Sequence, residues 1–144
     1  HLVGLIEINR PIVTVMTHGD YQEANILTKD GTIKDTFLID WEYCGRRTIA
    51  FDHLVNTLNT RNPHGLATRI RRYLTFASEP QYSQGLWHRR FQWDNLTVQQ
   101  ELALFLIEEL LFRLEEASLA NLRVLPNGSL VFLNEIHKFL NVRY

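Results

Sequence analysis

Two short apolar runs stand near the start of the chain, and each ends in polar side chains. Residues 12–15 lead into His18-Gly19-Asp20, and residues 37–39 lead into Asp40. Runs rich in β-branched and aromatic residues predict strands, and we expect these strands to be buried on both faces. Because a buried strand has little freedom to move its last residue, the polar groups that follow should be held in fixed positions.

A turn signal separates the two runs. Lys29-Asp30-Gly31 stands between Ile26-Leu27 and Ile33, which is a pattern typical of a β-hairpin. Such a hairpin would bring Asn25 and Asp40 back to the same end of a small sheet.

The rest of the chain is predicted to be helical. Four segments have apolar residues at helical spacing: 48–58, 62–77, 97–118 and 129–140. Asn62-Pro63 and a capping box at Thr97 mark two of the helix starts. The run 102–107 is apolar on all sides and should lie in the core. Residues 78–96 predict an irregular, aromatic-rich connection. The last helix is expected to bury one side, formed by Leu130, Leu133, Ile136, His137 and Leu140.

Composition indicates a single globular domain. The chain has 144 residues, of which 45% are hydrophobic and 22% charged, and this excludes a disordered chain. The net charge is −1, so nothing global attracts nucleic acid or an anionic membrane. A nucleic-acid interface is a weak alternative that would use Arg69, Arg71, Arg72, Arg89 and Arg90.

The single cysteine, Cys44, excludes a disulfide framework, and we expect it to be packed rather than nucleophilic. No apolar run has membrane-spanning length, and we expect a cytoplasmic protein.

The polar residues after the first run have the spacing of a kinase catalytic loop. Asp20 and Asn25 follow the order His-x-Asp-x-x-x-x-Asn, in which the Asp accepts the proton of a substrate hydroxyl and the Asn holds a magnesium ion. A second Asp at the end of the next hairpin strand would hold the magnesium that bridges the phosphates, and Asp40 has that position. An Asn, an Asp and phosphate oxygens suit Mg²⁺, which takes only one or two carboxylates from protein.

Three segments carry a resemblance to a known family. They are His18-Gly19-Asp20 with Asn25-Ile26-Leu27, then residues 39–43, then Phe51-Asp52. These segments resemble the catalytic loop, the metal-binding segment and a loop-bracing Asp of the aminoglycoside phosphotransferase and choline kinase superfamily. The resemblance covers about residues 15–56. The sequence departs from the aminoglycoside branch, which usually has Leu, His and Gly, at Tyr21, Gln22 and Ala24.

The resemblance implies an α+β fold, the mostly helical C-terminal lobe of a protein-kinase-like fold. A small β-hairpin sheet would carry the catalytic and metal-binding loops. Residues 1–144 would form one domain, with the catalytic loop and metal-binding hairpin at 12–42 and a helical subdomain at 48–144. The nucleotide-binding small lobe of such a kinase is missing, so we expect a fragment of a longer protein that is inactive by itself.

The family motif also implies supporting roles around the catalytic Asp20. His18 is expected to shape the loop by hydrogen bonding rather than to act as an acid or base, because Asp20 already fills that role. Asp52 should accept backbone N–H bonds from the loop. Glu42 either contacts metal or acceptor, or is simply solvated.

The implied activity is a phosphotransferase that moves the γ-phosphate of ATP to a hydroxyl of a small molecule, using Mg²⁺. The acceptor stays open among amino alcohols, sugars and aminoglycoside-like molecules. A non-catalytic, kinase-like scaffold or interaction module is the alternative. No nucleic-acid partner and no membrane span are expected, and a homodimer is possible.

Three groups of side chains have both a functional and a structural interpretation, and we favour the structural one for each. A set of glutamates either attracts an amine-bearing acceptor or faces solvent: Glu108, Glu109, Glu115 and Glu116. A set of aromatics either cages a quaternary ammonium or packs on the helices: Tyr82, Trp87 and Trp93. Arg46 and Arg47 either meet phosphate or form a solvated pair.

Overall fold

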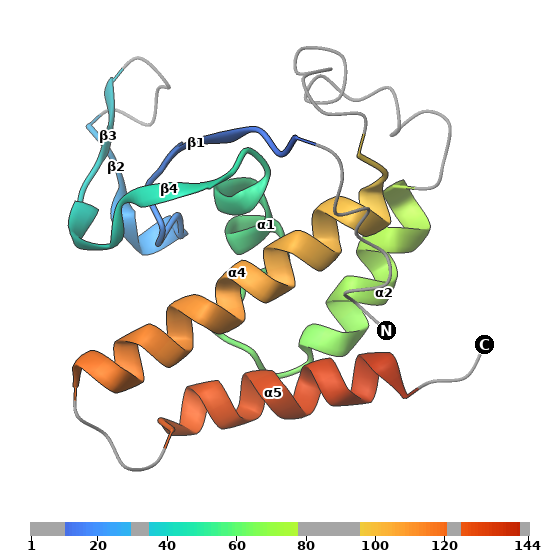
Figure 1. Ribbon diagram of the computed structural model, residues 1–144. Coiled ribbons are helices and arrows are strands. Elements are labelled where there is room, and N and C mark those ends of the chain that lie inside the picture. The colour runs from blue at the N-terminus through green and yellow to red at the C-terminus, as the bar shows by residue number, and fades with distance from the viewer. Residues whose placement is uncertain (1–10, 30–34, 78–95, 121–124, 142–144) are drawn as a thin grey trace.

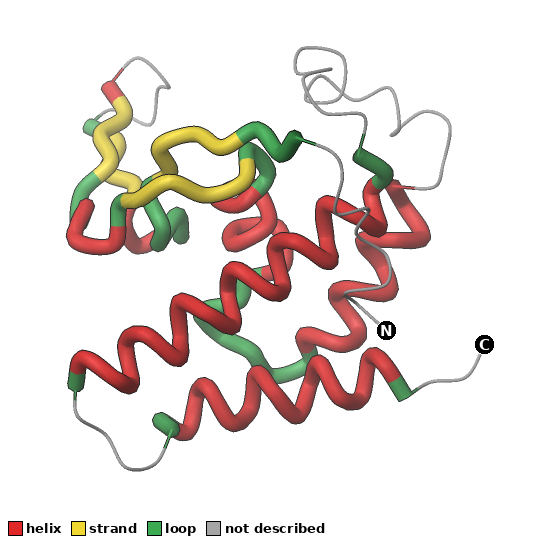
Figure 2. Tube along the Cα trace, in the orientation of Figure 1, coloured by secondary structure: helices red, strands yellow, loops and turns green. Residues whose placement is uncertain are grey.

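The computed structural model describes residues 11–29, 35–77, 96–120 and 125–141. Within them the chain is α+β, with two small antiparallel strand pairs beside a group of helices (Figure 1). One strand pair joins β1 (Thr14–Thr17) to β4 (Gly45–Thr48), and the other joins β2 (Ile26–Thr28) to β3 (Thr36–Leu38). Figure 2 shows both pairs together on one side of the helices.

The β2–β3 pair confirms the predicted hairpin. Ile26 faces Leu38 and Thr28 faces Thr36 across the pair. The Lys29 N–H donates to the Asp35 carbonyl at 3.1 Å and continues the ladder towards the turn.

Strand β4 was not predicted, because its residues Gly45–Thr48 lack an apolar alternation. It forms through pairing with β1, in which Thr17 faces Gly45 and Thr14 faces Thr48. The expectation that the strands are buried on both faces is wrong: Met16 in β1 is 67% exposed and Phe37 in β3 is 61% exposed. In the described residues each sheet has two strands, and no helix covers the face that carries these exposed side chains.

The described residues then form four helices, α1 (Phe51–Leu58), α2 (Leu66–Ala77), α4 (Val98–Leu119) and α5 (Asn127–Leu140). The hydrophobic core lies between them and is formed by Phe51, Leu54, Val55, Leu58, Leu66, Ile70, Leu102, Phe105, Leu106 and Phe132. Most of the predicted apolar run on α4 is buried there, as expected. The capping box at Thr97 is also confirmed, since the Gln100 N–H donates to Thr97 Oγ1 and the Thr97 N–H donates to Gln100 Oε1.

The predicted start of α2 is wrong, and the predicted apolar side of α5 is buried only in part, with Ile136 packed against the core. Helix α2 begins at Leu66 rather than at Asn62-Pro63, because the chain first turns at Pro63 and Gly65, whose φ is +74°. Helix α5 buries Ser129, Phe132 and Glu135, whereas the predicted side has Leu130 and Leu140 about 40% exposed. α5 packs on α2 and is turned so that Phe132 reaches the core and Glu135 reaches the start of α2.

The aromatic connection at 78–95, with Tyr82, Trp87 and Trp93, lies outside the described residues. So does the tip of the hairpin at 30–34. Among the helices that are described, none combines the length and the apolar character that a membrane crossing requires.

Candidate functional site

The loop between β1 and β2 brings Asp20 and Asn25 into direct contact. Asn25 Nδ2 donates to Asp20 Oδ2 at 2.8 Å and to the Asp20 carbonyl at 2.9 Å. Both side chains are buried. A short 3₁₀ turn, Glu23–Asn25, folds the chain back so that residues five positions apart meet. The Asn25 N–H donates to the Gln22 carbonyl at 3.0 Å within this turn. The predicted proximity of these two residues is therefore confirmed.

Asp52, in the first turn of α1, fixes the backbone of this loop. Its Oδ2 accepts the His18 N–H at 2.7 Å and its Oδ1 accepts the Gly19 N–H at 3.0 Å. These are the backbone bonds that were expected of Asp52. Because hydrogen bonds to an ionised acceptor are stronger than neutral ones, they tie the loop firmly to the core helix.

His18 links the loop to the end of strand β3. Its Nε2 donates to the Ile39 carbonyl at 2.7 Å, and its Nδ1 accepts the Asp20 N–H at 3.3 Å. The buried ring also lies on Trp41, with ring centroids 4.6 Å apart. Both ring nitrogens are occupied by backbone groups, as expected for a residue that shapes the loop.

Asp40 lies at the same end of the hairpin as Asn25. The Ile39 N–H donates to the Asn25 carbonyl at 3.0 Å, and Asp40 is the residue that follows Ile39 in the chain. Asp40 has a left-handed conformation, with φ 65° and ψ 60°, which is uncommon for a residue other than glycine. Its side chain is exposed. In the part of the chain that is described, its carboxylate makes no hydrogen bond or ion pair, including none to Asp20 or Asn25.

The oxygen atoms of this loop fit Mg²⁺ better than they fit a transition metal. No group of three or more His, Cys, Asp or Glu that could hold a metal is found among the described residues. Asn25 uses its amide nitrogen on Asp20, which leaves the amide oxygen for another partner. One amide oxygen is a weak ligand set by itself, and it would suit Mg²⁺ only when a carboxylate, phosphate oxygens and water complete the shell. Asp40 is the carboxylate predicted for that place, but in the described part of the chain it does not hydrogen-bond to Asn25.

Arg61 is a site residue that the sequence analysis missed. Its Nε donates to Asp20 Oδ1 at 2.5 Å, its Nη1 to Glu109 Oε1 at 2.7 Å, and its Nη2 to the Gly19 carbonyl. Arg113 also donates to Glu109 Oε1, at 3.0 Å. The guanidinium thus joins the Asp20 carboxylate to a buried carboxylate of α4. No local motif marks Arg61, because its partners lie 41 and 48 residues away.

The expectation that the α4 glutamates face solvent is wrong for two of them. Glu109 is fully buried, and burial raises its pKa while Arg61 and Arg113 act in the opposite direction. Burial also raises the pKa of the half-buried Glu108, whose carboxylate accepts the Thr48 N–H at 2.9 Å and the Thr48 hydroxyl at 2.6 Å. Glu115 is exposed, as expected.

Two further residues near the loop differ from their predicted environments. Arg47 is not solvated with Arg46: it donates to Thr17 Oγ1 at 2.9 Å and lies 4.8 Å over the Phe51 ring. Cys44 is exposed rather than packed. Glu42 is also exposed, and both of its interpretations stay open.

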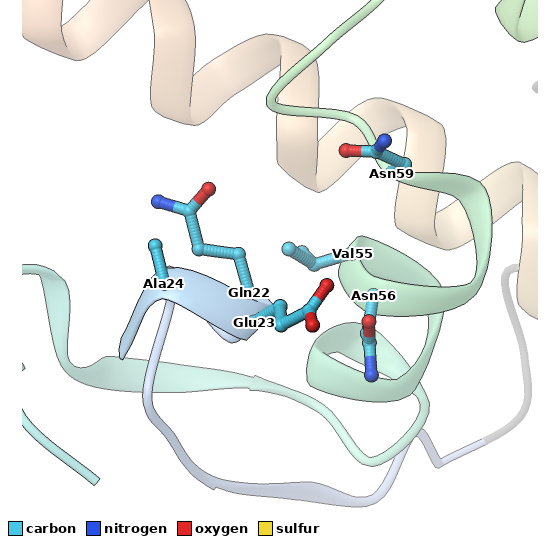
Figure 3. Close-up of a pocket in the computed structure, with 6 residues that line it drawn as sticks. All are labelled: Gln22, Glu23, Ala24, Val55, Asn56 and Asn59. Carbon is cyan, nitrogen blue, oxygen red and sulfur yellow. The ribbon is translucent and has the colours of Figure 1, made fainter. Parts of the chain in front are cut away.

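A pocket of about 650 Å³ lies beside the loop (Figure 3). Side chains of the loop and its 3₁₀ turn line one side of it, and side chains of α1 and its C-cap line the other: Gln22, Glu23, Ala24, Val55, Asn56 and Asn59. Gln22 connects the pocket to the loop carboxylate, because its Nε2 donates to Asp20 Oδ2 at 2.8 Å.

Comparison of the chain with protein-family models, curated proteins and solved structures finds no significant match.

Proposed function

We propose that this chain is the catalytic-loop lobe of a phosphotransferase that moves the γ-phosphate of ATP to a hydroxyl of a small molecule, using Mg²⁺. The fold would be the C-terminal lobe of a protein-kinase-like enzyme of the aminoglycoside phosphotransferase and choline kinase type. The observation that carries the proposal is the 2.8 Å hydrogen bond from Asn25 to the Asp20 carboxylate, in a loop whose backbone Asp52 holds.

Asp20 has the capacity to act as the base. An ionised carboxylate offers about four lone-pair positions, and Asp20 uses three of them, on Arg61, Gln22 and Asn25. The remaining position would accept the acceptor hydroxyl. In the reaction the hydroxyl oxygen bonds to the γ-phosphorus, the bond from that phosphorus to the bridging oxygen of ADP breaks, and Asp20 takes the hydroxyl proton.

Asn25 and Asp40 are the residues that would hold the metal. When bound, Mg²⁺ would neutralise charge on the phosphates, which is the main requirement of phosphoryl transfer. The chain's own contribution is positioning: Asp52 and His18 fix the loop backbone, so the base and the metal ligands keep their spacing during the reaction.

A non-catalytic scaffold is the second candidate, and one contact favours it. Arg61 forms an ion pair with Asp20 at 2.5 Å, and this pair neutralises the group that would serve as base. A scaffold would use the Arg61 network only to join the loop to α4.

The test is Asp20→Asn in the full-length protein, assayed for ADP formation with Mg-ATP and a panel of amino alcohols, sugars and aminoglycosides. Loss of a general base costs about 100-fold or more, so turnover should fall at least that far. The melting temperature should also fall, because the ion pair with Arg61 is lost, and circular dichroism at the assay temperature checks that the variant is still folded. Asp35→Asn, at the other end of the hairpin, is the matched control. Wild-type turnover in Asp20→Asn would reject catalysis by this loop, and failure of the wild-type protein to bind Mg-ATP would favour the scaffold.

A further inference from the structure

The two oxygens of the Asp20 carboxylate have different surroundings. Oδ2 accepts two N–H groups, from Gln22 and from Asn25, both at 2.8 Å, and so uses both of its lone pairs. Oδ1 accepts the Arg61 Nε–H at 2.5 Å, and no second donor to Oδ1 is found among the described residues. The lone pair that is left for a substrate hydroxyl therefore belongs to Oδ1, the oxygen that Arg61 holds.

Arg61 is itself held by contacts at each of its nitrogens. Nη1 donates to Glu109 Oε1 at 2.7 Å, and Nη2 donates to the Gly19 carbonyl of the loop. The guanidinium carbon lies 5.1 Å from the centre of the Phe112 ring, and the side chain is only 17% exposed. Because a guanidinium is planar and its donors form a rigid fork, these contacts fix the direction from which Nε meets Oδ1.

The buried Glu109 prevents Arg61 from being the counter-ion of Asp20 alone. Glu109 Oε1 accepts hydrogen bonds from Arg61 at 2.7 Å and from Arg113 at 3.0 Å. Two guanidinium groups and two carboxylates form this cluster, so the charge of Arg61 is shared between Asp20 and Glu109. Arg61 can therefore orient the Asp20 carboxylate without cancelling its negative charge.

We propose that Asp20 Oδ1 is the oxygen that receives the hydroxyl proton, and that Arg61 is the positioning residue that holds this oxygen in place. The inference rests on the proposed function and adds an atom and a residue to it. As the hydroxyl oxygen bonds to the γ-phosphorus and the bond from that phosphorus to ADP breaks, the proton passes to the free lone pair of Oδ1. Arg61 supplies orientation and makes no contact with ATP, since all three of its nitrogens bind groups inside the protein.

Arg61→Lys in the full-length protein separates positioning from charge. Lysine keeps the positive charge but has one nitrogen in place of the fork, so it cannot meet all three acceptors with the same geometry. Misplacement of a catalytic group by about 1 Å costs about 100-fold, so kcat should fall by about 10- to 100-fold. KM for Mg-ATP should be unchanged, because Arg61 does not bind the nucleotide.

Arg113→Lys is the matched control. Arg113 is also an arginine bound to Glu109 Oε1, but its other printed partner is the Thr60 carbonyl and not the loop. The substitution should lower the melting temperature and leave kcat near the wild-type value. An equal fall in kcat in the two lysine variants would mean that the cluster acts only on stability, and it would overturn the positioning role while phosphotransfer itself stands. Wild-type kcat in Arg61→Lys would overturn it too.

A double variant covers the case in which Arg61→Lys does not fold. Arg61→Gln combined with Glu109→Gln removes one cation and one buried anion together, so neither is left without its partner. Glu109→Gln alone keeps Arg61 on Asp20 and Gly19 and should retain kcat. The double variant should lose as much kcat as Arg61→Lys, and retention of kcat in the folded double variant would overturn the positioning role.

Hydrogen exchange of residues 18–25, followed by mass spectrometry without substrate, gives a readout that needs no turnover. Arg61→Lys should speed exchange of these backbone N–H groups by about tenfold, the effect of losing one charge-assisted hydrogen bond, whereas Arg113→Lys should not. Absence of turnover in the wild type rejects the proposed function, and faster loop exchange in Arg61→Lys alone then still supports Arg61 as the residue that positions Asp20. Equal loop exchange in the two variants overturns that role.

Discussion

Gly19 occupies a position in the loop that no other residue fits. Its φ is +84°, and a Cβ added to it would lie 2.1 Å from the Tyr43 carbonyl oxygen. The loop has little room to shift, because Asp52 holds the Gly19 N–H and Arg61 holds its carbonyl. The contact with the Tyr43 carbonyl gives the physical reason for a glycine at this position.

Gly19→Ala should therefore lower the free energy of unfolding by about 2–4 kcal/mol, through backbone strain and a clash with main-chain atoms. Urea denaturation of the chain measures this. Gly128→Ala is the matched control: an added Cβ there meets nothing within 4 Å, and alanine should stabilise the start of α5 by up to about 1 kcal/mol. Equal effects of the two substitutions would contradict the argument.

At the scale of elements, α5 supplies the cap that α2 lacks. The Ala67 N–H, at the start of α2, donates to Glu135 Oε2 at 3.0 Å, and Lys138 donates to Glu135 Oε1 at 2.6 Å. The Lys138 hydrogen bond, followed by the Ala67 N–H, lowers the pKa of Glu135 from 4.5, although its burial acts in the opposite direction. Because the folded pKa is the lower one, the unfolded chain binds the proton more tightly. The stabilisation is thus complete above pH 4.5 and is lost as the pH falls towards the lowered value.

Glu135→Ala should lower the free energy of unfolding by about 1–2 kcal/mol at neutral pH, because it removes both a helix cap and a negative charge near a helix N-terminus. The variant should also lose less stability than the wild type between about pH 6 and about pH 3. Urea denaturation at several pH values measures both effects. Glu115→Ala, at an exposed site, should change stability by less than about 0.5 kcal/mol. A parallel pH dependence in Glu135→Ala and wild type would refute the capping role.

At the scale of the whole molecule, the candidate site is assembled from three segments. The loop supplies Asp20 and Asn25, the hairpin supplies Asp40, and the turn after α1 supplies Arg61. Asp40 lies at the same end of the hairpin as Asn25 because β2 and β3 pair in register, with Ile39 bonded to Asn25. Among the described residues its exposed carboxylate hydrogen-bonds to neither Asp20 nor Asn25, so the convergence of all three side chains stays a prediction.

If the proposed function is correct, Asp40→Asn in the full-length protein should raise the Mg²⁺ concentration for half-maximal turnover by more than about tenfold, because a carboxylate ligand is lost. Turnover measured against Mg²⁺ concentration tests this. Asp35→Asn removes the same charge at the far end of the hairpin and should leave the Mg²⁺ requirement unchanged. An unchanged requirement in Asp40→Asn would remove Asp40 from the metal site.

The sequence was a good guide where the decisive contacts are local. The hairpin follows from turn residues between apolar runs, the start of α4 from a capping box, and the Asp20–Asn25 contact from a five-residue spacing that one short turn closes. In each case the interacting groups lie within about fifteen residues, so their geometry is set mainly by the chain between them.

Tertiary structure alone decided the remaining features. Gly45–Thr48 forms a strand because it pairs with β1. Phe132 of α5 lies in the core because α5 packs on α2. Glu109 lies inside the protein because Arg61 and Arg113 reach it from elsewhere in the fold. A buried charge is tolerated only where a partner compensates it, and a partner 48 residues away leaves no trace in the local pattern of polar and apolar residues.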